Sequence, residues 1–75
     1  MDDSRTYSFS VTGMQRGSCG RLIDQTLEET AGVHRSQTSV PAGRTVVDVD
    51  AAAVDPDILA AVIGSLGYTA RRDPP

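Results

Sequence analysis

The chain has 75 residues, a formal net charge of −3 and 39% hydrophobic residues, so it has room for one small globular domain. The chain contains no lysine, and the acidic excess argues against a non-specific nucleic-acid binder, which needs a basic face. A single cysteine excludes an internal disulfide. The amino-terminal residues are acidic and no apolar run follows them, so we expect neither a signal peptide nor a membrane span. We expect either a protein of the reducing cytoplasm or a piece cut from a larger protein.

The first third of the chain predicts a strand followed by a helix. Apolar residues alternate with serines from Tyr7 to Val11, a period of two that predicts a half-buried strand ended by Gly13. The pattern becomes helical from Cys19 to Ala31, and Gly32 is expected to end this helix at its C′ position. The expected inward residues are Leu22, Ile23, Thr26 and Leu27, and the expected outward residues are Asp24, Gln25, Glu28 and Glu29.

A hairpin is predicted next. The stretch from Val33 to Val40 is a weak strand, because its inward positions would hold Ser36, Thr38 and Val40. A Pro-Ala-Gly turn at 41–43 follows. Residues 45–50 then form a better strand, in which the inward positions hold Thr45, Val47 and Val49.

The last part of the chain predicts a second helix and a short strand. Asp55 is a good N-cap, and Pro56 suits the first helical position. Gly67 ends the helix, residues 68–70 form a last short strand, and residues 71–75 read as a polar, mobile tail. The apolar stripe of this helix is Ile58, Leu59, Val62, Ile63 and Leu66.

The predicted order is βαββαβ, the ferredoxin-like arrangement of the α+β class. It gives a four-stranded antiparallel sheet with two helices on one face. We expect one domain over residues 5–72, with flexible ends at 1–4 and 73–75. Many functions use this fold, so the fold alone decides none of them.

Short motifs at the element boundaries carry a resemblance to a known family. They are Gly13-Met14 after the first strand, Cys19 opening a helix, Gly32-Val33 after that helix, and Gly67-Tyr68 at the last strand. From about Tyr7 to Arg71 the chain resembles the heavy-metal-associated domain family, which includes copper chaperones, metal-binding domains of copper-exporting ATPases and mercury-binding proteins. The resemblance implies the fold above, Cu(I) or, less favoured, Hg(II) as the bound metal, and a metal-transporting ATPase or other metal protein as partner.

The resemblance is incomplete at the metal loop, where the family motif reads G-M-x-C-x-x-C. Cys19 matches the second cysteine, while Arg16 stands in place of the first. Soft thiolates are the preferred ligands of Cu(I), and two of them form a chelate. With one thiolate, tight binding needs a further ligand from a second protomer, a partner or a small thiol. The positive end of the helix, with Gly17 or Ser18 as N-cap, and the Arg16 charge favour the thiolate form of Cys19.

Three functions remain open: a metal-binding or metal-delivery module that uses Cys19, a thiol redox or adduct module, and a metal-free docking domain. We expect no enzyme, because no nucleophile–base set, paired carboxylates or phosphate-binding glycine loop appears. His34 is expected at the opposite end from Cys19, and Met14 is more readily a core filler than a ligand. Around the proposed ligand Cys19, the expected site residues are Gly13, Met14, Arg16, Ser18 and Tyr68.

Overall fold

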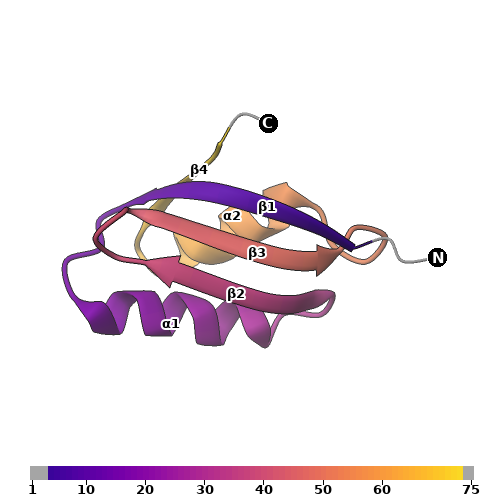
Figure 1. Cartoon of the computed structure of the whole chain (residues 1–75), viewed down its shortest axis with the longest axis horizontal. Coiled ribbons are helices and arrows are strands. Elements are labelled where there is room, and N and C mark those ends of the chain that lie inside the picture. Colours follow the sequence, from indigo (N-terminus) through magenta and orange to yellow (C-terminus); the bar gives the residue numbers. More distant parts are fainter. Residues whose placement is uncertain (1–3, 74–75) are drawn as a thin grey trace.

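The structure, a computed structural model, describes residues 4–73. They form one antiparallel sheet in the strand order β2-β3-β1-β4, with two helices packed against it (Figure 1). The predicted ferredoxin-like βαββαβ order is therefore confirmed. The elements are β1 (Ser4–Thr12), α1 (Gly17–Glu28), β2 (Val33–Ser39), β3 (Arg44–Asp50), α2 (Pro56–Ser65) and β4 (Thr69–Arg72).

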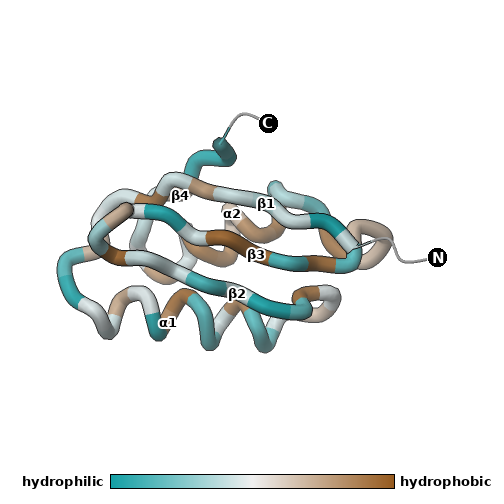
Figure 2. The backbone as a smooth tube through the Cα atoms, viewed as in Figure 1, coloured by the Kyte–Doolittle hydropathy of each residue, from teal (hydrophilic) through white to brown (hydrophobic). Residues whose placement is uncertain are grey.

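The core lies between the two helices and one face of the sheet. In the ladder between β1 and β3, Phe9 is opposite Thr45 and Tyr7 is opposite Val47, so these side chains share a face. Hydrophobic and hydrophilic residues alternate along these strands (Figure 2), which is the pattern of a sheet with one buried face. The buried hydrophobic residues are Phe9, Val11, Ile23, Leu27, Val47, Val49, Val54, Leu59 and Ile63.

Two apolar residues that were predicted to face inward are exposed instead. Leu22 in α1 is 44% exposed, and Ile58 in α2 is 46% exposed. Successive residues of a helix are turned by about 100°, so burying Ile23 carries its neighbour Leu22 toward solvent. The buried stripe of α1 includes Gly20, where an added Cβ would lie 3.1 Å from a methyl carbon of Val40. This glycine allows the helix to approach β2 closely.

Two acidic residues of α1 that were predicted to face outward instead bind β2. Asp24 accepts hydrogen bonds from the hydroxyl of Ser36 at 2.7 Å and from both the backbone N–H and the hydroxyl of Thr38 at 3.1 and 2.7 Å. Glu28 accepts from the backbone N–H of Ser36 at 3.2 Å. β2 is an edge strand, so its outward N–H groups need partners from outside the sheet. The carboxylates of α1 supply them.

The observed ends of α2 match those predicted from the sequence, whereas α1 ends earlier than predicted. Asp55 caps α2 by accepting from the N–H of Ile58 at 3.1 Å, and Gly67 follows the C-cap, as predicted. In contrast, α1 ends at Glu28 rather than Ala31, and a short turn separates it from Gly32. Gly32 has φ +91° there, and an added Cβ would lie 2.9 Å from the Ala53 Cβ.

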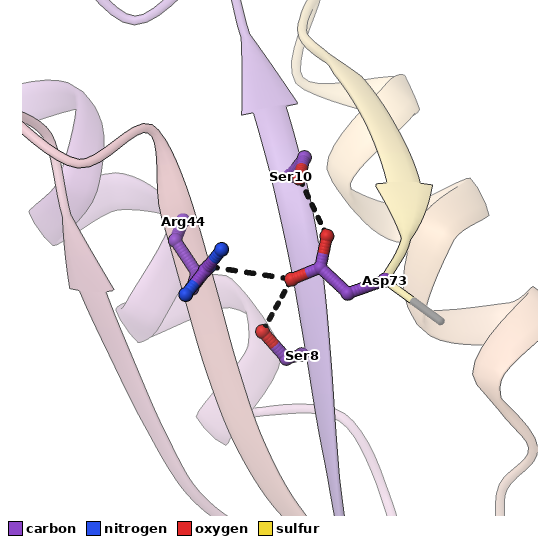
Figure 3. A network of polar contacts seen from close by, with 4 residues as sticks. All are labelled: Ser8, Ser10, Arg44 and Asp73. Carbon is purple, nitrogen blue, oxygen red and sulfur yellow. Dashed lines mark hydrogen bonds and ion pairs between the residues drawn. The ribbon is translucent and has the colours of Figure 1, made fainter. Parts of the chain in front are cut away.

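Three residues of the expected polar tail, 71–73, have defined places in the structure. Arg71 and Arg72 belong to β4, and the Asp73 carboxylate is held on the outer face of the sheet (Figure 3). Asp73 accepts hydrogen bonds from Ser8 at 2.7 Å and Ser10 at 2.5 Å and pairs with Arg44 at 3.3 Å. No local pattern in the sequence predicts this network, because Ser8 and Asp73 are 65 residues apart in the chain.

The domain bounds of 5–72 and the flexibility of the ends stay predictions. Of those ends, residues 1–3 and 74–75 lie outside the described residues, while Ser4 starts β1 and Asp73 forms the network above. Within residues 4–73, no helix combines the length and the apolar character that crossing a membrane requires.

Candidate functional site

The loop between β1 and α1 holds Gly13, Met14 and Arg16, three of the residues that were predicted to surround Cys19. Gly13 leaves the strand with φ +99°, a backbone conformation that few other residues adopt. An added Cβ at Gly13 would lie 3.4 Å from a ring carbon of Tyr68. The small residue therefore lets the Tyr68 ring lie against the loop, at the same end of the domain as Cys19.

The first turn of α1 positions the thiol. The helix begins at Gly17, and its N-cap is Arg16, whose backbone is extended with φ −137° and ψ 156°. The predicted cap at Gly17 or Ser18 is therefore wrong, because both residues lie within the helix. Arg16 makes no side-chain cap, but its carbonyl accepts from the N–H of Cys19 at 3.0 Å. This bond fixes the backbone of Arg16 against that of Cys19, one helical turn apart.

The electrostatic surroundings favour the thiolate of Cys19. A hydrogen bond from the Tyr68 side chain is the largest influence holding the pKa of the Cys19 thiol below its ordinary value. Hydrogen bonds from the backbone of Gln15 and Arg16 lower the pKa further, burial opposes them, and the Arg16 charge adds the smallest effect. The predicted direction is confirmed, but the main cause is Tyr68 rather than Arg16.

The same contact acts on the other partner. The hydrogen bond with Cys19 is the largest influence raising the pKa of the Tyr68 hydroxyl, followed by burial and the nearby thiol. The shared hydrogen bond therefore favours the neutral form of Tyr68 and the charged form of Cys19. The thiol itself is only partly buried, so it stays accessible to a ligand or a reagent.

The other predicted site residues have distinct places. Met14 is half-buried and packs against the hydrophobic core, which favours its interpretation as a core filler. Ser18 and Arg16 are exposed, and neither is buried under the loop. His34 is exposed near the start of β2, whereas Gly20, next to Cys19, packs on Thr38 near the end of that strand.

The arrangement offers a single soft ligand. Within residues 4–73, no three histidine, cysteine or acidic side chains lie close enough together to hold a metal ion. What the site can supply is one accessible thiol beside an arginine, and a tyrosine hydroxyl and backbone groups favour its charged form. Such a group can bind a soft metal ion with help from another ligand, or attack a disulfide or an electrophile.

The model of the heavy-metal-associated domain matches residues 8–69, which is well over half of the chain. The chain belongs to the heavy-metal-associated domain family. A search of curated protein sequences gives no match.

Solved structures support the same assignment. A copper chaperone of Enterococcus hirae in its apo form is 28% identical, with a TM-score of 0.84, over 89% of this chain and 98% of the other. A copper binding domain from HMA7, a P-type ATPase, is 23% identical with a TM-score of 0.90, over 93% and 95% of the two chains. The N-terminal domain of PacS from Synechocystis PCC6803 is 24% identical with a TM-score of 0.83, over 93% and 98%. At these lower identities the last two show a shared fold.

Proposed function

We propose that this protein is a small heavy-metal-binding or metal-delivery module whose cargo is Cu(I), with Hg(II) as a less favoured alternative. The observation that carries the proposal is the Cys19 thiolate, held by Tyr68 at the start of α1 in a chain of this family. Thiolate sulfur is a ligand that Cu(I) prefers. Similarity to a copper chaperone and to a copper binding domain supports copper as the cargo.

The second ligand has to come from outside the Cys19 loop. Two thiolates on one loop would form a chelate, but Arg16 stands at the position that the family resemblance assigns to the other cysteine. A second protomer, a partner protein or a small thiol can each supply the missing sulfur. The exposed Arg16 opposes a bare cation and tolerates a metal already neutralised by thiolates.

The partners follow from the same proposal. A metal-transporting ATPase or another metal protein is the natural donor or acceptor of the ion, and a homodimer bridged by the ion is the alternative. We place the protein in the cytoplasm, where a single thiol stays reduced. We assign it a binding role rather than an enzymatic one.

The lowered pKa of the Cys19 thiol also favours a second candidate function. The accessible thiol with a lowered pKa suits a thiol redox or adduct module, in which the Cys19 thiolate attacks a disulfide such as oxidised glutathione. One glutathione thiolate leaves, and a mixed disulfide remains on Cys19. If Cys19 neither binds a metal ion nor forms an adduct, the remaining candidate is a metal-free docking domain.

A Cu(I) titration of the ¹⁵N-labelled protein, without oxygen and with ascorbate as reductant, tests the metal proposal. We expect amide shifts confined to residues 13–22 and to Tyr68, and their loss in Cys19→Ser. His34→Ala is the matched control and leaves the shifts unchanged, because this residue lies at the other end of the domain. Shifts that persist in Cys19→Ser would refute the proposal. Incubation with oxidised glutathione and mass measurement then reports the adduct function separately.

A further inference from the structure

The two edge strands of the sheet, β2 and β4, differ in whether their outward backbone groups have hydrogen-bond partners. At the β2 edge, the outward N–H groups of Ser36 and Thr38 are occupied by the carboxylates of Glu28 and Asp24. This edge is therefore closed to another strand, because the donors that a new strand would use already have partners. α1 provides the cover (Figure 1).

The β4 edge carries no such cover. Asp73 donates its N–H to the Ser8 carbonyl, and Arg71 is opposite Ser10, so these residues direct their backbone toward β1. In an antiparallel pair the bonded positions alternate, so Ala70 and Arg72 direct their N–H and C=O groups away from the sheet. Within residues 4–73, no side chain or loop binds these outward groups.

The open edge is also basic on both faces. Arg71 and Arg72 are adjacent in β4, so their side chains project to opposite faces of the sheet. Arg72 lies over the Tyr7 ring, 4.8 Å from its centre, and neither arginine forms an ion pair within residues 4–73. A shallow hollow of about 260 Å³ beside the strand is lined by Ser10, Arg71, Arg72 and Asp73. The Asp73 carboxylate there is already bound to two serines and to Arg44 (Figure 3).

We propose that the β4 edge is a docking site for an extended acidic segment of a partner protein, which adds as a fifth strand. The segment pairs its backbone with the outward groups of Ala70 and Arg72. Two adjacent acidic residues on it meet Arg71 on one face and Arg72 on the other. The site differs from the Cys19 loop and binds without a metal ion.

Charge decides between this occupant and a second copy of the chain. Two β4 edges in antiparallel contact would bring the arginine pair of one copy against that of the other, and like charges on paired strands are destabilising. An acidic strand replaces this repulsion by attraction. The docked strand would also end near Tyr68, which precedes β4 and contacts Cys19, so a partner bound here has the candidate metal loop within reach.

Peptide titration of the ¹⁵N-labelled protein tests the proposal. The probe is the acetylated and amidated peptide Thr-Val-Asp-Glu-Val-Thr, whose adjacent acids point to opposite faces of a strand. We expect amide shifts over residues 68–73, largest at Ala70 and Arg72. The matching peptide with Lys-Arg in place of Asp-Glu is expected to give none. A fully N-methylated acidic peptide, which keeps the charge but cannot pair as a strand, is expected to lose the shifts.

Variants locate the charge effect. Arg71→Glu is expected to weaken binding of the acidic peptide by about fivefold or more and to create binding of the basic peptide. Arg35→Glu, an exposed change on the closed β2 strand, is expected to leave binding unchanged. Shifts centred on residues 33–39, equal binding of the N-methylated peptide, or no effect of Arg71→Glu would each overturn the proposal.

Discussion

The Tyr68 side chain hydrogen-bonds the sulfur of Cys19, and this contact is the largest influence lowering the pKa of the thiol. The two residues come from distant parts of the sequence, the entry to β4 and the first turn of α1. Their meeting depends on the pairing of β4 with β1, which puts Thr69 opposite Thr12 and thus brings the two loops together. The lowered pKa of the thiol therefore depends on the tertiary fold.

Removing the tyrosine hydroxyl is expected to raise the pKa of Cys19. In Tyr68→Phe, the thiolate loses its strongest hydrogen-bond donor, so the midpoint of alkylation by iodoacetamide moves to higher pH. Arg16→Ala moves it in the same direction but by less, because the Arg16 charge is the smallest of the influences. The measurement is the alkylation rate as a function of pH.

Tyr7→Phe serves as the control for this comparison. Tyr7 is a half-buried residue of β1 that contacts Arg72 rather than the thiol, so the midpoint should stay where it is in the unchanged protein. A larger shift in Arg16→Ala than in Tyr68→Phe would show that charge, and not the hydroxyl, controls the thiolate.

The Asp73 network is expected to make stability depend on pH. Hydrogen bonds from Ser10 and Ser8 lower the pKa of Asp73, burial opposes them, and Arg44 adds a smaller favourable effect. A carboxylate whose pKa is lowered in the folded state stabilises the protein above its unfolded pKa of about 3.9. This contribution is lost as the pH falls through the lower folded pKa.

Urea unfolding of the unchanged protein and of Asp73→Asn, at pH 7 and in steps down to pH 2, measures this effect. We expect the variant to be less stable at pH 7 and the difference to shrink below about pH 4. Glu29→Gln, an exposed change just after α1, should show no comparable difference. A difference between the unchanged protein and Asp73→Asn that persists undiminished at pH 2 would mean that the carboxylate charge is not its source.

Truncating the core should distinguish buried from exposed apolar residues. Leu27 and Ile63 are fully buried, so Leu27→Ala and Ile63→Ala should each lower the free energy of unfolding by about 2–5 kcal/mol. Leu22→Ala and Ile58→Ala are matched controls in the same helices at exposed positions, and they should cost less than about 1 kcal/mol. Equal losses at the buried and exposed positions, measured by denaturant unfolding, would contradict the assignment of the helix faces.

Local patterns in the sequence predicted the helices and strands and their order. The alternation through Phe9 and the cap at Asp55 were sufficient to predict the order of elements, because each signal lies within its own element. Polar pairing between elements was not predictable. Asp24 looked like a solvent-facing residue of α1, and Ser8 and Asp73 are 65 residues apart in the chain. At the site, the motif singled out Cys19 as the candidate ligand. The leading effect of Tyr68 on the pKa of Cys19 was not predictable, because it depends on a tertiary contact.

Arg16 stands at the position where the family motif has its first cysteine, so the loop lacks a second thiolate. Arg16 is one helical turn before Cys19, and the two backbones are joined by the bond from the Cys19 N–H to the Arg16 carbonyl. In Arg16→Cys, a second sulfur enters the same loop and the opposing positive charge is removed, so one chain can chelate the ion alone. We expect Cu(I) affinity to rise at least tenfold, or ~1.4 kcal/mol.

A competition titration of both proteins against the same Cu(I) chelator measures the change, and sedimentation with and without Cu(I) reports the stoichiometry. The unchanged protein should need a second protomer or an added small thiol, and any ion-bridged dimer should weaken at low salt, where the two Arg16 charges repel without screening. Arg16→Cys should bind one ion as a monomer. Arg21→Cys is the control, because a cysteine two residues after Cys19 in α1 faces another direction and adds a thiol without a chelate. If Cu(I) affinity rises no more in Arg16→Cys than in Arg21→Cys, the loop does not hold residue 16 where it can bind the metal ion. Cys19 would then serve thiol chemistry or the domain would serve docking.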